Sequence, residues 1–185
     1  SANSGVNWTA TENNRNWTGI ASSSNGEKLA AVVNGGNSWT STDSGTTWTE
    51  SISRNWTAIE SDSGGVMIVA TVKNGYIWNS GDSGETWGYF PNSLVKSWSD
   101  IAMSSDGIKL AATVEDGSIY TSDDSGANWT ERVNDSNRNW NGIASSSDGE
   151  KLAATDSGGQ IYTSTDSGAN WTATENNRNW TGIAS

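Results

Sequence analysis

Apolar residues gather in four short runs that recur at intervals of about forty residues, with polar and Gly-rich segments between them. Each run is apolar at nearly every position instead of at alternate positions; the runs are 29–33, 67–72, 110–114 and 152–155. A strand with one solvated face would alternate, so both faces of these strands must be covered. The pattern predicts inner β-strands that lie between neighbouring sheets.

The segment 140–179 shows the repeating unit most clearly. Its strands are expected at 140–145, 151–155, 160–165 and 170–174. The separators combine Asp, Ser and Gly, which is typical of tight hairpin turns. Four antiparallel strands in about forty residues are typical of one propeller blade.

A turn motif, S-x-[D/N]-S-G-x-x-W, precedes the fourth strand of each unit. Its five tryptophans lie 40, 39, 42 and 42 residues apart, at Trp8, Trp48, Trp87, Trp129 and Trp171. In such a turn the acidic or amide side chain accepts hydrogen bonds from backbone N–H groups, and Gly supplies a positive φ. A structural role is therefore predicted for the third residue of each motif: Asn3, Asp43, Asp82, Asp124 and Asp166.

This motif, its spacing and its place between the third and fourth strands resemble the Asp-box repeats, also called BNR repeats, of sialidase-type propellers. Similar units occur in sortilin-type receptors, in xyloglucan-cleaving glycosidases and in the photosystem II assembly factor. The resemblance covers every repeat and implies an all-β propeller of four-stranded antiparallel blades. It implies no particular activity, because enzymes, receptors and scaffolds carry this motif alike.

The repeats predict one domain over residues 1–185, with four complete blades and a split or incomplete fifth. The expected parts are an outer strand at 1–16, blades at 17–55, 56–97, 98–139 and 140–179, and a first strand at 180–185. Residues 1–22 and 164–185 match at 19 of 22 positions. Three arrangements satisfy this pattern: a five-bladed propeller with a reduced fifth blade, a segment of a longer repeat array, or copies of the chain docked head to tail into an oligomer or filament.

The charge and composition exclude several classes of partner. A formal net charge of −11 argues against a nucleic-acid partner, because phosphate binding needs a basic surface. No apolar stretch is long enough to insert into a membrane. The absence of Cys and His removes disulfides and the commonest metal ligands, so neither a metal nor a cofactor is expected. An extracellular or cell-surface location is predicted, although the lack of Cys does not fix the compartment.

Catalytic residues are not evident in the sequence. A sialidase-like site needs converging arginines, a Tyr nucleophile and an acid, whereas four of the five arginines occupy one repeating slot. Tyr120 and Tyr162 occupy the repeat position of Trp39 and Trp78, which indicates packing. The strongest irregularity, the connection 89–96, contains no acid. The chain is therefore predicted not to be an enzyme, with a sialidase-like or other glycoside hydrolase as the alternative.

Each connection between units ends in a cation, one further residue and a Trp. The pairs are Arg15–Trp17, Arg54–Trp56, Lys96–Trp98, Arg138–Trp140 and Arg178–Trp180. Two interpretations remain open. In the first, the cation stacks on an aromatic ring or pairs with an acid such as Glu12, Glu50 or Glu175. In the second, the cations and tryptophans form repeated sites for a glycan or an acidic polymer.

The predicted function is a non-catalytic extracellular scaffold or adhesion module that binds glycans or associates with itself. An assembly-factor-like, protein-binding propeller is a further alternative. Seven Asn residues also lie in glycosylation sequons, either as acceptors in a secreted protein or through coincidence with the repeat. They are Asn7, Asn16, Asn55, Asn128, Asn134, Asn170 and Asn179.

Overall fold

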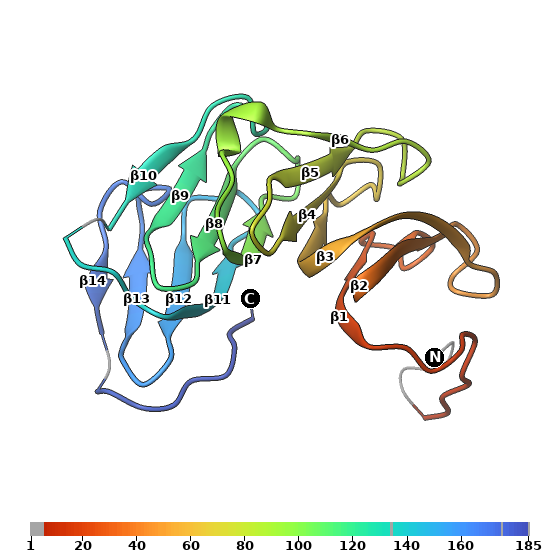
Figure 1. The fold of residues 1–185 in the computed structure, drawn as a ribbon, viewed down its shortest axis with the longest axis horizontal. Coiled ribbons are helices and arrows are strands. Elements are labelled where there is room, and N and C mark those ends of the chain that lie inside the picture. The colour runs from red at the N-terminus through yellow and green to blue at the C-terminus, as the bar shows by residue number, and fades with distance from the viewer. Residues whose placement is uncertain (1–5, 134, 175, 185) are drawn as a thin grey trace.

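The computed structural model describes residues 6–133, 135–174 and 176–184. These residues form fourteen β-strands and one short 3-10 helix, Pro91–Ser93. The strands are arranged in antiparallel sheets of six, four and four (Figure 1). The predicted all-β class is confirmed, and no helix in the described part of the chain is long and apolar enough to cross a membrane.

The six-stranded sheet joins the first two repeats. Its strands are β1 (Trp17–Ser22), β2 (Leu29–Ser41), β3 (Thr49–Ser61), β4 (Ile68–Val72), β5 (Ile77–Ser80) and β6 (Gly88–Tyr89). Separate strands were expected within β2 and within β3, and here the prediction is wrong. Only seven residues separate Trp48 from Trp56, so the fourth strand of one repeat runs directly into the first strand of the next. The residues near Gly35, where a turn was expected, are paired with β3, and the pairing shifts in register between Asn34 and Gly36.

The other two sheets follow the prediction closely. The third repeat contains β7 (Trp98–Met103), β8 (Leu110–Val114), β9 (Ile119–Ser122) and β10 (Thr130–Arg132). The fourth contains β11 (Trp140–Ser145), β12 (Leu152–Asp156), β13 (Ile161–Ser164) and β14 (Thr172–Ala173). The strand expected at 140–145 coincides with β11, whereas β14 is shorter than the expected strand at 170–174.

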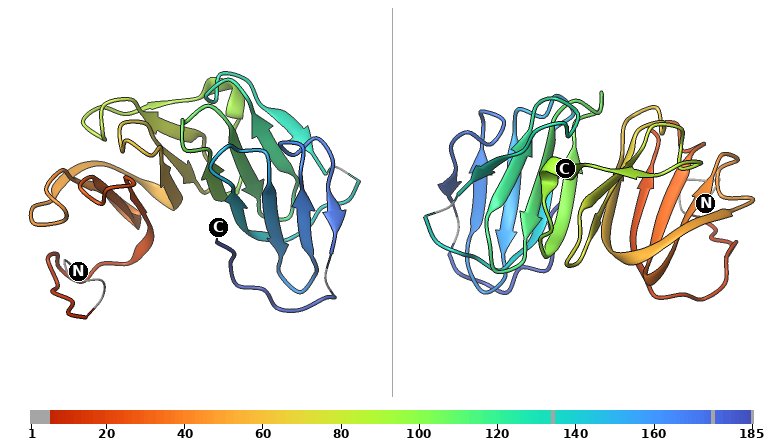
Figure 2. Two further views of the ribbon diagram at one scale, coloured as in Figure 1. Left: turned by 180° about the vertical axis from the view of Figure 1, so that it is seen from behind. Right: turned by 45° about the horizontal axis from the view of Figure 1, so that its top comes forward.

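The sheets are arranged side by side as an arc, with the first strand of each repeat on the inner side (Figures 1 and 2). β1, β3, β7 and β11 contact one another in chain order. The arc is open between β1 and the C-terminal residues 176–184 (Figure 1).

Apolar side chains are buried between successive sheets instead of in one central core. One cluster joins Ala102, Ala111 and Ile119 of the third repeat to Ile143 and Leu152 of the fourth. Every residue of β4 is buried, as its uninterrupted apolar pattern predicts. Each repeat is therefore stabilised mainly by its neighbours, as in other repeat architectures.

Backbone hydrogen bonds also connect successive repeats. The N–H of Ser24 donates to the carbonyl of Ser63 at 2.9 Å, Ser63 donates to Ser105 at 2.8 Å, and Ser105 donates to Ser147 at 2.8 Å. All four serines lie in the turn between the first and second strands of a repeat. We call this row of bonds the serine ladder.

Candidate functional site

The cations of the predicted slots cover aromatic rings of the third strands. Arg15 lies 4.1 Å from the centre of the Trp39 ring, and Arg54 lies 4.2 Å from that of Trp78. The equivalent pairs are Lys96 over Tyr120 at 4.6 Å and Arg138 over Tyr162 at 4.8 Å; Arg178 lies 5.9 Å from Trp180. The structure thus contains the cation–aromatic stacking that was one of the two interpretations.

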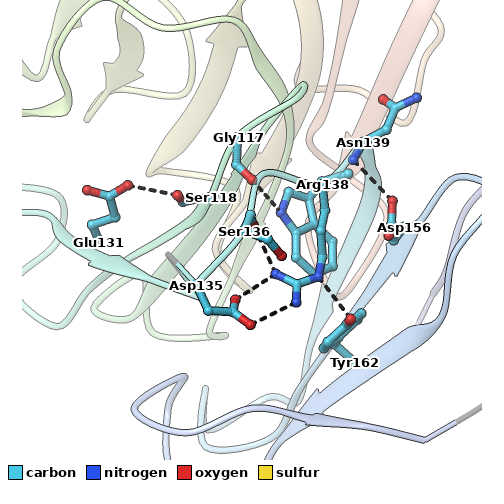
Figure 3. Close-up of polar contacts among 10 residues, drawn as sticks. Gly117, Ser118, Glu131, Asp135, Ser136, Arg138, Asn139, Asp156 and Tyr162 are labelled. Carbon is cyan, nitrogen blue, oxygen red and sulfur yellow. Dashed lines mark hydrogen bonds and ion pairs between the residues drawn. The ribbon is translucent and has the colours of Figure 1, made fainter.

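Arg138 makes the densest set of polar contacts among these cations (Figure 3). Its guanidinium donates to both carboxylate oxygens of Asp135, at 2.8 and 3.1 Å, and to the Tyr162 hydroxyl at 2.9 Å. The bond to Asp135 raises the pKa of Arg138 and lowers the pKa of Asp135. Of the acids expected as partners, Glu12 pairs with Arg15 at 3.4 Å, and Glu50 instead accepts from an Asn side chain. Glu175 lies outside the described residues.

Three of the slot tryptophans are core residues. Trp56, Trp98 and Trp140 have 0%, 1% and 1% of their surface exposed. Trp17, at 37%, and the partly buried Trp180 are more accessible. A sugar would need an open ring face, so burial leaves no such face at the first three positions. Glycan binding at these slots otherwise remains a prediction.

The turn motif forms a compact hydrogen-bonded unit. In its second copy, the Ser41 hydroxyl donates to Asp43 Oδ1 at 2.8 Å and accepts from the N–H of Gly45 at 2.9 Å. Asp43 also accepts from the backbone N–H of Thr47 at 2.8 Å and from its hydroxyl at 2.6 Å. The Trp48 indole N–H donates to the Gly45 carbonyl at 3.1 Å. The Asp side chain is thus occupied by its own turn.

The same bonds recur around Asp82, Asp124 and Asp166. Hydrogen bonds from the residue four positions later are the main cause of a lowered pKa at each acid, to about 2 for Asp43, Asp82 and Asp166. Asn3 lies outside the described residues.

The sequon side chains differ in their surroundings. Asn128 and Asn170 each donate from the amide nitrogen to the motif Asp, both at 2.7 Å, so attachment of a glycan there would break a turn bond. Asn7, Asn16, Asn55 and Asn179 are exposed, as are Asn128 and Asn170. Asn134 lies outside the described residues, and glycosylation stays a prediction.

Two acidic residues of the first strands line one cavity on the inner side of the arc. The cavity has a volume of about 330 Å³, and its lining includes Glu60 from β3, Asp100 from β7 and Ser145 from β11. We call it the inner cavity. Asp100 accepts hydrogen bonds from the backbone N–H groups of Ile101 at 2.9 Å and Ile143 at 2.8 Å, so its carboxylate also connects two sheets. Within the described part of the chain, the Glu60 carboxyl group has no hydrogen-bond partner, although its backbone is paired in the β3–β4 ladder.

Both carboxyl groups have raised pKa values. Burial raises the pKa of Glu60 from 4.5 to about 7, and the negative charge of Asp100 adds to this rise. Burial likewise raises the pKa of Asp100 from 3.8 to about 6, against the effect of its two backbone hydrogen bonds. Near neutral pH, Glu60 is thus the group more often protonated and Asp100 the group more often ionised.

Sequence reasoning missed this pair. Glu60 stands where the other complete repeats have Ala21, Ala102 and Ala144. Asp100 stands where they have Gly19, Ala58 and Gly142. A column-by-column comparison of the first strands would have found both acids, because each breaks the repeat. The connection 89–96 is a more conspicuous irregularity, but it contains no acid.

A second cavity, of about 300 Å³, lies at the start of the first strands. Its lining includes Lys73 and Glu115, which form an ion pair at 2.7 Å. The bond to Lys73 lowers the pKa of Glu115, which is the opposite of the shift at Glu60. Among residues 6–133, 135–174 and 176–184, no three acidic side chains cluster in a way that could hold a metal ion.

No protein-family model and no curated protein matches the sequence. Solved structures do match the fold. An ancestral GH74 enzyme is 18% identical over 86% of this chain and 24% of its own, with a TM-score of 0.72. The GH74 xyloglucanase of Xanthomonas campestris is 12% identical over 85% of this chain and 30% of its own, with a TM-score of 0.67. YCF48, solved with a bound D1 peptide, is 16% identical over 85% and 66%, with a TM-score of 0.59.

The chain spans less than a third of the length of these GH74 chains. The prediction that it is not an enzyme is wrong by this comparison, because structures of the same fold are glycoside hydrolases. That prediction relied on finding no acid at the irregular connection, whereas the acids that break the repeat are Glu60 and Asp100. At these identities the likeness is one of fold, and the fold is that of propeller-type proteins.

Proposed function

We propose that this chain is part of a carbohydrate-active β-propeller that binds a glycan at the inner cavity. The observation that carries the proposal is the convergence of Glu60 and Asp100, the two acids that break the first-strand repeat, on one cavity. A partly protonated carboxyl both donates and accepts hydrogen bonds, which suits the hydroxyl groups of a sugar. The likeness to GH74 enzymes supports a sugar as the ligand class.

Binding is tested by titrating the protein with a panel of neutral oligosaccharides, including xyloglucan fragments, in a calorimeter. Glu60→Gln should weaken binding at least about tenfold, since a charged or strongly polar hydrogen bond contributes of the order of 1.5–3 kcal/mol. Glu115→Gln is the matched control: it makes the same chemical change in the second cavity, and it should leave affinity unchanged. Equal loss in both variants, or no ligand in the panel, contradicts the proposal.

Glycoside hydrolysis is a second candidate, and the position of two carboxyl groups with raised pKa values on one cavity favours it. Hydrolysis of a glycosidic bond uses one carboxylic acid that protonates the leaving oxygen and one carboxylate that acts as base or nucleophile. Glu60, with a pKa of about 7, suits the acid, and Asp100, with a pKa of about 6, suits the carboxylate. In this assignment the Glu60 proton moves to the leaving oxygen as the bond from that oxygen to the sugar carbon breaks, and the carbon forms a new bond either to an Asp100 carboxylate oxygen, in an ester that water then hydrolyses, or to a water oxygen whose proton Asp100 accepts.

Release of reducing ends from the oligosaccharides that bind tests the hydrolysis. Activity should be highest between about pH 6 and 7, and Glu60→Gln should abolish it while Glu115→Gln retains it. Binding without release of reducing ends in any condition would reject hydrolysis and leave the binding proposal standing. Contact with a protein partner, as in YCF48 with its D1 peptide, and an extracellular location remain predictions that these assays do not address.

A further inference from the structure

One face of β1 is apolar and open to solvent. Ile20 is 68% exposed, whereas the equivalent residues Ile59, Ile101 and Ile143 are 5%, 4% and 4% exposed. A cavity of about 430 Å³ lies on this face, and Trp17, Ile20, Ala31 and Trp48 contribute to its largely apolar lining. We call this the trailing face of the first repeat.

The preceding repeat covers the equivalent face in every later repeat. Ile59 packs against the first repeat so closely that its Cγ2 lies 3.1 Å from the position of a Cβ built on Gly19. Ile143 shares its cluster with Ala102 and Ala111 of the third repeat. The surface that fits a trailing face is thus the opposite, leading face of a repeat, which is made of small residues of its first two strands.

Among the described residues, the C-terminal segment 176–184 is what covers the leading face of the fourth repeat. Ala153 and Ile161 there are partly exposed, whereas the equivalent Ala111 and Ile119 of the third repeat are buried. The Trp180 indole N–H donates to the Gly159 carbonyl at 3.1 Å, just as Trp140 donates to Gly117 at 3.0 Å.

The segment on that face has the same sequence as β1 and its approach. Residues 178–184 and residues 15–21 are both Arg-Asn-Trp-Thr-Gly-Ile-Ala. Asn141 Nδ2 donates to the Trp180 carbonyl, and a Cβ built on Gly142 would lie 3.2 Å from the backbone of Ile183. The fourth repeat therefore already holds, in this chain, a copy of the strand that begins the first repeat.

We propose that the trailing face of the first repeat docks onto the leading face of the fourth repeat of a second copy, where it displaces that copy's residues 176–184. The incoming β1 replaces an identical heptapeptide, so the local contacts of the strand are exchanged one for one. The incoming repeat also brings Trp48, which is only partly buried and lines the open cavity of the trailing face. Burial of that additional apolar surface is the driving force for the exchange.

The serine ladder fits the same geometry. In each internal junction the turn of one repeat donates a backbone N–H to the carbonyl of the next turn. Within the described residues the ladder begins at Ser24 and ends at Ser147. In the docked pair, the Ser147 N–H of one copy would donate to the Ser24 carbonyl of the other. Because the two faces differ, the contact is heterologous and leaves a free face at each end.

Sedimentation of the full chain over a range of concentrations tests the proposal. The unaltered protein should form dimers and longer species as its concentration rises, and Ile20→Asp should raise the dissociation constant by at least about tenfold, because docking would bury an unpaired carboxylate. Ile108→Asp is the matched control: Ile108 is also exposed, at 47%, but lies in a turn, so association should be unchanged. A protein that stays monomeric at every concentration, or one that Ile20→Asp leaves unaltered, overturns the proposal.

A mixing experiment distinguishes head-to-tail docking from a symmetric contact. Ala153→Asp places the charge on the leading face, so this variant alone and Ile20→Asp alone should each stay monomeric. Their mixture should form a one-to-one dimer, because one intact trailing face meets one intact leading face. Thermal melting of each variant first confirms that it is folded. A mixture of two folded variants that remains monomeric contradicts the assignment of the two faces.

Discussion

Replacing Glu60 by Gln should make the protein more stable at high pH. The folded-state pKa of Glu60 is raised from 4.5 to about 7, so the folded protein holds this proton more tightly than the unfolded chain does. The free energy of unfolding of the unaltered protein therefore falls as pH rises through this interval, and the loss is complete above pH 7. Without solvent screening of the carboxylate, a pKa rise of this size would make the free energy of unfolding about 3 kcal/mol lower at high pH than at low pH.

The carboxyl group adjoins a cavity, so part of its charge is solvated, and we expect Glu60→Gln to raise the free energy of unfolding at pH 8 by about 1–3 kcal/mol. At pH 4 both proteins carry a neutral side chain, and their stabilities should agree. Urea titrations at pH 4, 6 and 8, followed by Trp fluorescence, measure the difference. Glu115→Gln is the control with the opposite sign, because the ion pair with Lys73 lowers the pKa of that acid. An effect of Glu60→Gln that is the same at pH 4 and pH 8 would refute the reasoning.

Three further predictions concern one residue each of a turn motif, of the core and of a cation slot. Asp82→Asn should destabilise the protein above pH 4, and its urea midpoint should meet that of the unaltered protein as pH falls toward 2, because the lowered pKa of Asp82 contributes stability only while the group is ionised. Trp98→Ala should cost about 3–5 kcal/mol in urea titrations through loss of a buried ring, whereas Trp8→Ala, at an 80% exposed position, should change the midpoint little. Arg54→Ala should lower the free energy of unfolding by about 0.5–1 kcal/mol through loss of the contact with Trp78. Arg54→Lys, measured in the same urea titrations, should lower it less, because the charge is kept; equal losses in the two variants would argue against a contribution of the charge.

The sequence predicted the fourth repeat well because its separators are strong local signals. Each Asp-Gly or Ser-Gly turn ends a strand within a residue or two of the expected place, and β11 coincides with its expected range. Local signals failed where two strands merged, since the turn residues near Gly35 were absorbed by pairing between β2 and β3. The outcome there depends on the short connection to Trp56, which is a property of two repeats together.

The candidate site was less predictable, for a geometrical reason. A cation two positions before a Trp suggests contact with that Trp, yet Arg54 lies over Trp78, which comes from the following hairpin. The position of that ring depends on the register between strands, which residue spacing alone does not give. Glu60 and Asp100 lie 40 residues apart and in different relative positions of their strands, so only the packing of β3 beside β7 shows that they share a cavity.

The serine ladder makes the spacing of the sheets insensitive to side-chain chemistry. Its donors and acceptors are main-chain groups, so a substitution at Ser63 that keeps the turn leaves the bond in place, whereas the Ser105 hydroxyl also donates to the Ser147 carbonyl, at 2.9 Å. Whole units can then be gained or lost by duplication or deletion of the gene segment while the pitch of the arc is preserved. A protein fastened in this way is free to diverge in its loops and inner strands, one unit at a time, which is how isolated acids such as Glu60 can arise within an otherwise uniform array.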